Sequence, residues 1–400
     1  MSVSRYRLTG REFAGDAPDL SGLLAAAHEK KVRPRCLCTA AEPEMYVARF
    51  GDDLLLKRMP GTGHLHDPSC PTFDPPPELS GLGQVNGKAI VSDHEGATAL
   101  KLDFPLSMRS GRAATLADGT AAAATSATAT PSKLSLLGML HYLWDTAELT
   151  KWRPSWAGKR GWWLVHRELA AVAERTSSKA GPLSSILLVP PQFHPDRKEA
   201  LARERDRFLH HLQPAKGKPV PLGLLVAEIK SQEPSQYGRR LRFKHLPDMA
   251  FFMDEDLGRS FDKLTTTKAR MVEAIDGAHM MAIATFSMCG NYAEIREIAV
   301  MPVTADWIPF DNEREITLVK ALADRNFVKC LRYNLRAESP MASVLLTDTT
   351  PPTALYVPPH HLAPEAEADL REIATEGAYP AWIWAAGEFE MPELPMVRRG

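Results

Sequence analysis

The chain has no long apolar run. No stretch approaches the roughly 18 apolar residues that a membrane-spanning helix needs, and the opening residues MSVSRYRLTGREFAGD lack the apolar core of a secretory signal peptide. These absences argue against a membrane protein and against a secreted one. We therefore expect a cytoplasmic protein that has no membrane partner.

An excess of one charge is also missing. The sequence has 48 Lys and Arg against 49 Asp and Glu, a net charge of -1, and 44% hydrophobic residues. These values are ordinary for a globular protein and exclude a wholly disordered one. At roughly 150 residues per domain, the 400-residue chain should form about two to four domains.

The common enzyme motifs are absent as well. The sequence contains no G-x-G-x-x-G after a strand, no Walker A motif, no G-x-S-x-G and no H-E-x-x-H. No catalytic residue is therefore assigned. Whether the protein is an enzyme stays open, and a non-enzymatic role is favoured.

Cysteine is scarce, yet three of the five cysteines stand close together. Cys36 and Cys38 lie in RPRCLCTA, and Cys70 ends GTGHLHDPSC, which also holds His64 and His66. In a reducing compartment, clustered cysteines indicate metal ligands or redox groups rather than disulfides. Thiolate sulfur and neutral imidazole suit Zn(II), which takes four such ligands in a structural site.

A predicted β-hairpin separates the two cysteine segments. EMYVARF and DDLLLKRMP flank a turn at residues 51–53 and would return the chain so that both segments face one ion. His66 is favoured as the fourth ligand because three residues separate it from Cys70, and His64 is the alternative. Four protein ligands leave no position for water, so we expect structural Zn(II). Free thiols and a redox role stay open.

Periodicity and composition indicate an α+β, multidomain chain. We expect a zinc-binding β-rich hairpin domain, a linker, a basic helical module, a β-rich middle domain and a C-terminal α/β domain. Their predicted bounds are 1–112, 113–131, 132–214, 215–303 and 304–400.

The predicted helical module is basic, although the whole chain is neutral. Residues 131–220 hold fifteen Lys or Arg against eight Asp or Glu, whereas residues 301–400 hold nine against fifteen. Two helical patterns flank TKWRPSWAGKRG, an arrangement typical of a helix-turn-helix that contacts phosphates and a DNA groove. DNA is therefore the predicted partner, through Lys151, Arg153, Lys159, Arg160 and Arg167.

Other interpretations of this basic segment stay open. Its four tryptophans could be core residues and its cations an ordinary solvated face, or the segment could contact a protein or lipid. The acidic C-terminal domain is a candidate surface for a protein partner, which would make the chain a scaffold.

The predicted C-terminal order of helix, three strands, helix and strand is weakly similar to the restriction-endonuclease-like fold. An active member would carry a carboxylate and an acid-x-Lys triplet that bind Mg(II) and position water. The chain has PMAS and LYVPP at those places. Asp348 stands at the wrong end of its strand, so Glu313 or Glu315 would be the only remaining acidic residue of such an active site. We expect a degenerate nuclease domain, and a divergent Mg-dependent nuclease is the enzymatic alternative.

Several segments resemble the signatures of an uncharacterised family of proteobacterial proteins defined by three N-terminal cysteines. They are RPRCLC, MYVARF, LLLKRMPGTGHLHDPSC, MPVTADWIPFDNERE, KCLRYN and VLLTDTTPPTALYV. The resemblance matches Cys36, Cys38 and Cys70 to the defining cysteines, implies no catalytic residue, and implies an association with integrative or conjugative elements. The combined expectation is a non-enzymatic, zinc-containing, DNA-associated protein of a mobile genetic element.

Overall fold

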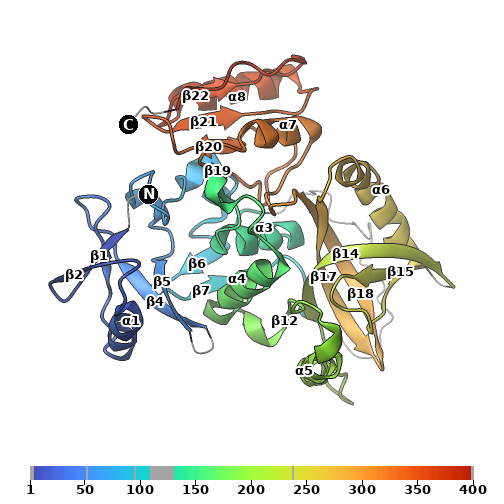
Figure 1. Cartoon of the computed structure of the whole chain (residues 1–400). Helices are drawn as coiled ribbons and strands as arrows, with labels where there is room; N and C mark the ends of the chain where they lie inside the picture. Colours follow the sequence, from blue (N-terminus) through green and yellow to red (C-terminus); the bar gives the residue numbers. More distant parts are fainter. Residues whose placement is uncertain (1–3, 51–52, 94–95, 109–129, 237, 398–400) are drawn as a thin grey trace.

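The computed structural model describes most of the chain (Figure 1). It covers residues 4–50, 53–93, 96–108, 130–236 and 238–397. The predicted linker at 113–131 lies outside these residues except for its last two positions. Within them, the protein is a mixed α+β structure with eight α-helices and several sheets, as the sequence predicted.

The N-terminal part is a small unit of short strands. Its elements are β1 (Arg5–Leu8), β2 (Arg11–Ala14), α1 (Leu20–Glu29), β3 (Arg35–Cys36), β4 (Met45–Phe50) and β5 (Asp53–Arg58). β4 and β5 form the predicted antiparallel hairpin, whose turn at residues 51–52 lies outside the described part. Leu24 of α1 packs with Val47 of β4 in a small core. That core also contains Cys36 and Cys70.

Two helices lie at the centre of the molecule. The elements around them are α2 (Leu82–Val85), β6 (Ile90–Ser92), β7 (Thr98–Leu100), α3 (Leu136–Thr146), α4 (Trp162–Arg175), β10 (Thr176–Ser178) and β11 (Gly181–Pro182). Ser135 caps α3 by accepting a bond from the Gly138 amide at 3.0 Å. The Trp144 indole donates to the Trp307 carbonyl at 3.0 Å and is fully buried. α3 is therefore a core helix that is covered by the surrounding parts.

The middle of the chain forms a six-stranded sheet that closes on itself. Its strands are β12 (Leu187–Leu188), β14 (Gly223–Ser235), β15 (Gly238–Phe243), β16 (Phe251–Asp254), β17 (His279–Cys289) and β18 (Tyr292–Val303). The order is β12-β14-β15-β16-β18-β17, and β14 also pairs with β17. The helices beside it are α5 (Lys198–His210) and α6 (Glu255–Glu273) (Figure 1). The closed strands surround an apolar core that includes Phe243, Phe251 and Phe286.

The C-terminal part has the predicted element order. It comprises α7 (Glu313–Ala321), β19 (Phe327–Lys329), β20 (Val344–Leu346), β21 (Thr353–Tyr356), α8 (Pro364–Glu376) and β22 (Ala381–Ile383). The sheet order is β22-β21-β20-β19-β9, in which β9 (Lys151–Trp152) comes from the predicted helical module. This order does not establish a likeness to the restriction-endonuclease fold.

Several strand pairs join segments that the sequence analysis placed in different domains. β7 pairs with β10, β9 with β19, and β12 with β14. A further pair joins β8 (Ser107–Met108) to β13 (Val220–Pro221). The largest apolar core likewise combines residues from all four described parts. The predicted domain bounds stay a prediction, and the packing crosses each of them.

The segment between α3 and α4 does not support the predicted helix-turn-helix. A helix-turn-helix joins its helices by a turn of about 3–4 residues, but here the connection contains β9 and the 3-10 helix η3 (Pro154–Trp156). The Trp152 indole donates to the Ala323 carbonyl at 2.9 Å, and the ring is buried beside Phe327. Trp152, one of the four tryptophans that suggested a DNA-binding turn, instead anchors a sheet strand.

Gly81 lies where the N-terminal half packs closely on the C-terminal part, so a substitution there tests this contact. Its amide donates to the Leu331 carbonyl at 3.0 Å, and a Cβ atom there would lie 1.8 Å from the Arg332 carbonyl oxygen. We expect Gly81→Ala to lower the free energy of unfolding by about 3 kcal/mol, because the neighbouring backbone must move.

The matched control is Gly22→Ala in α1, where a Cβ atom would meet nothing within 4 Å. It should leave stability unchanged or raise it by up to about 1 kcal/mol. Urea unfolding of the two variants and the parent protein measures both effects. Equal midpoints for Gly81→Ala and the parent would contradict the docking described.

Candidate metal centre

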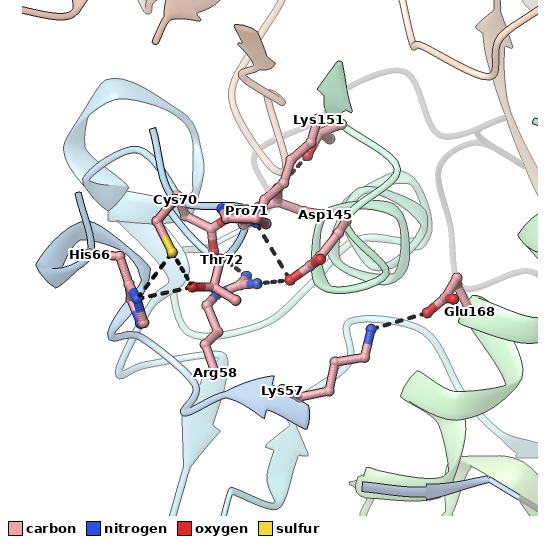
Figure 2. Close-up of polar contacts among 12 residues, drawn as sticks. Lys57, Arg58, His66, Cys70, Pro71, Thr72, Asp145, Lys151 and Glu168 are labelled. Carbon is pink, nitrogen blue, oxygen red and sulfur yellow. Dashed lines mark hydrogen bonds and ion pairs between the residues drawn. The ribbon is translucent and has the colours of Figure 1, made fainter. Parts of the chain in front are cut away.

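Three short segments bring four metal-ligating side chains together. Cys36 ends β3, which pairs with β1, and Cys38 follows two positions later. The β4–β5 hairpin returns the chain to the same side, where the 3-10 helix η1 (Gly63–Leu65) precedes His66. A further turn places Cys70 beside the His66 ring, as Figure 2 shows.

The spacing of the four ligand atoms fits one ion. The Cys36 and Cys70 sulfurs lie 3.8 Å apart, and the Cys38 sulfur lies 3.3 Å from Nδ1 of His66. All four ligand atoms lie within 4.8 Å of one another. With zinc–sulfur bonds of about 2.3 Å, a tetrahedron has sulfur–sulfur edges of about 3.8 Å. The residues present therefore fit a metal ion, and they are the four that the sequence analysis predicted.

The structure shows which of the two candidate histidines faces the cysteine thiols. His66 is 3% exposed, and its Nδ1 faces the thiols of Cys38 and Cys70. Its Nε2 is buried without a hydrogen-bond partner in the described part of the chain. His64 is exposed on η1 and lies outside the cluster. Nδ1 of His66 is thus the atom placed to hold an ion.

The three thiols cannot all ionise easily without a cation. The hydrogen bond with Cys36 lowers the pKa of Cys70 to about 3, and the same contact raises the pKa of Cys36. Burial raises the pKa of Cys38, which also accepts a bond from the Asp67 amide at 3.4 Å. One thiolate forms readily, and the other two need a compensating positive charge. A divalent cation at the centre would supply it.

Thr72 is a polar neighbour that the sequence analysis missed. Its hydroxyl oxygen lies 2.9 Å from Nδ1 of His66 and 3.1 Å from the Cys70 sulfur (Figure 2). A hydroxyl can donate to a thiolate, and groups that support metal ligands in this way orient them and tune the ion. The available signal was its position two residues after Cys70.

The loop from His66 to Thr72 also rests on the core of the molecule. The Pro71 carbonyl accepts a bond from the Lys151 ammonium at 2.9 Å, and the Ser69 carbonyl accepts one from Arg153 at 3.1 Å. Figure 2 shows Lys151 reaching this loop from the start of β9. The metal-ligating loop and the strand from the helical module are therefore connected by charge-assisted hydrogen bonds.

A network of buried charges continues from this contact. Arg58 of β5 pairs with Asp74 and, at 2.5 Å, with Glu148, while Lys151 pairs with Asp74 at 3.1 Å. Lys57, which directly precedes Arg58 in β5, pairs with Glu168 of α4 at 3.1 Å (Figure 2). All of these residues except Lys151 line one side of a cavity of about 150 Å³.

The carboxyl groups of this network have different pKa values because their surroundings differ. Burial alone would raise the pKa of Glu148, but Lys151, Lys57 and Arg58 hold it at about 2. Burial, together with a nearby carboxylate, raises the pKa of Asp145 to about 6. Asp145 also accepts a bond from the Tyr333 hydroxyl at 2.8 Å. The network therefore favours the charged form of Glu148 and disfavours that of Asp145.

The five predicted DNA-contacting cations have different environments. Lys151 and Arg153 donate to the loop described above, and Arg160 donates to three backbone carbonyls. Arg167 pairs with the neighbouring glutamate, and Lys159 is exposed. Four of the five therefore have partners within the protein. The carbonyl partners of Lys151 and Arg153 lie 80 and 84 residues away in sequence, so the acid-free segment appeared free for nucleic acid.

The acidic residues considered for a nuclease are also separated. Glu315 pairs with Lys329 at 3.1 Å, and both side chains are buried. Asp348 accepts two bonds from Arg325 at 2.9 and 2.8 Å. Glu313 is exposed at the start of α7. Each buried carboxylate already has a cationic partner, and among the described residues these three acids form no metal-ligating group.

The chain belongs to a family of proteins of unknown function, DUF1173, whose model matches residues 6–387. This confirms the predicted resemblance to an uncharacterised family, whereas the proteobacterial and mobile-element context stays a prediction. No curated protein and no solved structure matches the chain. In the described part, no helix combines the length and apolarity needed to cross a membrane.

The two histidines provide a direct test of the ligand set. We expect His66→Ala to weaken Zn(II) binding by more than about 100-fold, since changes to outer-shell groups alone cost roughly 10- to 100-fold. His64→Ala, the matched control, should bind like the parent because its ring is exposed outside the cluster. Competition with a chromogenic chelator measures both affinities. Loss of affinity in His64→Ala alone would contradict this ligand set.

Proposed function

We propose that this is a zinc protein in which structural Zn(II), bound by Cys36, Cys38, His66 and Cys70, attaches the N-terminal unit to the core. One observation carries the proposal: three sulfurs and one imidazole nitrogen lie within 4.8 Å of one another. Sulfur and imidazole ligands in tetrahedral array favour Zn(II) over oxygen-preferring cations.

The donor set supports a structural rather than a catalytic ion. A catalytic zinc site keeps one position open for water or substrate, and here four protein ligands occupy the tetrahedron. Two of the ligands are buried cysteines with small exposed fractions, 1% for Cys36 and 7% for Cys70. Three thiol ligands must also stay reduced, which suits the cytoplasm.

The loop that carries His66 and Cys70 is what the ion would hold in place. Its carbonyls at Ser69 and Pro71 accept bonds from Arg153 and Lys151. A fixed loop keeps these acceptors in position, so the ion stabilises the N-terminal unit and its contact with β9 together. The apolar core of this unit is small, and a bound ion compensates for that.

Metal content tests the proposal together with local stability. The purified protein should contain one Zn(II) per chain, and the double variant Cys36→Ser, Cys38→Ser should lose it. Amide protons of β4, β5 and residues 63–72 should then exchange at least about 100-fold faster, because zinc binding contributes on the order of 10 kcal/mol in small zinc-dependent folds.

Two controls define the result. Cys289→Ser should keep the metal, since Cys289 lies on β17 outside the cluster. Exchange in β17 and β18 should stay unchanged in the double variant, because that core is separate. A parent protein that is fully folded and free of metal would contradict the proposal.

A second candidate function is association with nucleic acid, in keeping with the DNA binding expected from the sequence. The specific observation is an exposed aromatic side chain among cations. Trp163 is 51% exposed, the Arg167 guanidinium lies 5.2 Å from its ring, and Lys159 is exposed four residues earlier. Such a pair favours stacking on the bases of a single strand over insertion of a helix into a groove. A role in a mobile element depends on this second proposal.

Salt dependence and one tryptophan test this association. Trp163→Ala should weaken single-stranded DNA binding by about 5- to 100-fold, the range for removing one base-stacking ring. Lys159→Gln should reduce the slope of log affinity against log salt by about 0.7, the value for one phosphate contact on a single strand.

The control is Tyr292→Ala, which removes a comparably exposed aromatic ring from β18. It should leave binding unchanged. Fluorescence anisotropy with a labelled oligonucleotide over a salt series gives these values. Binding that is absent, or equal in Trp163→Ala and the parent, would contradict the nucleic-acid proposal.

A further inference from the structure

A second cavity, of about 200 Å³, lies on the other side of α4 from the metal centre's charge network. Its walls come from α4, from the segment 187–193 that starts at β12, from α5, and from residues 245–248 after β15. Figure 1 shows α4, β12 and α5 as neighbours. Most of the lining is apolar, including Ala170, Leu187, Phe193, Leu201 and Phe208.

His166 of α4 lines this cavity with a ring whose proton position is fixed. Its Nδ1 lies 3.1 Å from the Val189 carbonyl oxygen, which can only accept a hydrogen bond. Nδ1 therefore carries the proton, and Nε2 of the neutral ring has a free lone pair. Burial lowers the pKa of His166, in keeping with a neutral ring.

His245 lines the same cavity, and its ring proton is on the other nitrogen. Its Nδ1 accepts a bond from the Phe193 amide at 3.2 Å, so the proton of the neutral ring is on Nε2. The ring stacks on Trp162 at 5.4 Å between centroids, and the backbone φ of His245 is +67°. A non-glycine residue at positive φ is costly and needs support from its surroundings. The fold thus holds this ring firmly.

The two rings leave one acceptor and one donor without partners. In the described part of the chain, no group donates to Nε2 of His166 and no group accepts from Nε2 of His245. A mostly apolar cavity with a few placed polar groups is the usual form of a small-molecule site. A ligand that both donates and accepts a hydrogen bond would satisfy both nitrogens.

We propose that this cavity binds one small aromatic alcohol of the phenol class, with its hydroxyl group between His166 and His245. A hydroxyl both donates and accepts. A cavity of about 150 Å³ holds a benzene molecule, so 200 Å³ accommodates one ring with a small substituent. The site is separate from the zinc ligands, and the inference does not depend on the proposed function.

The cover of the cavity offers a way in. α5 packs loosely on the molecule: only one of its residues, Leu209 near its end, is buried. At the rim, Lys198 of α5 pairs with Asp248 at 3.7 Å, and both side chains are exposed. Exposed ion pairs contribute little stability. The first turns of α5 can therefore separate from the 245–248 turn to admit a ligand.

The test titrates the full-length protein with phenol and with toluene, which has the same ring without the hydroxyl. Calorimetry should give a Kd for phenol on the order of 1 mM or tighter. Toluene should bind at least about 10-fold more weakly, because it can form no hydrogen bond with either Nε2 atom. In nitrogen NMR spectra, phenol should shift Nε2 of His166 and of His245 but leave His64 unchanged.

Two matched variants change the cavity and its surroundings. Ala170→Leu fills the cavity from α4 and should abolish binding of both compounds. Ala200→Leu adds the same side chain on the exposed face of α5, outside the lining, and should bind phenol like the parent. His166→Phe should lower phenol affinity to the level of toluene.

Three outcomes would overturn the proposal. They are equal affinities of the parent for phenol and toluene, no phenol binding at a concentration on the order of 10 mM, and phenol binding that persists in Ala170→Leu. If a variant loses its fold, the nitrogen shifts of the parent protein decide alone: their absence at saturating phenol overturns the assignment.

Discussion

The close approach of three thiols, which cannot all ionise together without a cation, is the constraint on which the N-terminal half of this protein depends. Cys36 and Cys70 hold their sulfurs 3.8 Å apart in a small core, where two negative charges at that distance are strongly unfavourable. A bound dication, as proposed, would reverse the sign of this interaction. The same side chains that would disrupt the unit in their ionised form would then hold its segments together.

This constraint extends beyond the four ligands. The loop between His66 and Thr72 offers backbone carbonyls to Lys151 and Arg153, and Lys151 belongs to a network with Asp74 and Glu148. Buried ion pairs recover their desolvation cost only when their geometry is good. The position of the loop therefore determines whether the charges on β9 are well paired, and the proposed ion would fix the position of the loop. The proposal therefore makes metal binding and the docking of the N-terminal unit energetically one event.

Part of this was readable in the sequence. The C-x-C and H-x3-C spacings predicted which four residues meet, because a hairpin between them can close the loop locally. The C-terminal order of elements followed from apolar periodicity. Lys151 and Trp152 could not be placed in this way, since β9 has only two residues and its partner β19 lies far along the chain. The same holds for Thr72 and Asp74, whose roles arise from tertiary contacts. The closure of β14 onto β17 depends on long-range register that no local pattern encodes.

X-ray absorption at the zinc edge of the purified protein measures the central claim most directly. The account predicts a shell of three sulfur atoms at about 2.3 Å and one nitrogen at about 2.0–2.1 Å from the ion. His66→Ala should lose the nitrogen scatterer while the sulfur shell stays. A protein without zinc, or an ion surrounded mainly by oxygen, would contradict the view that a structural metal ion holds the N-terminal unit on the core.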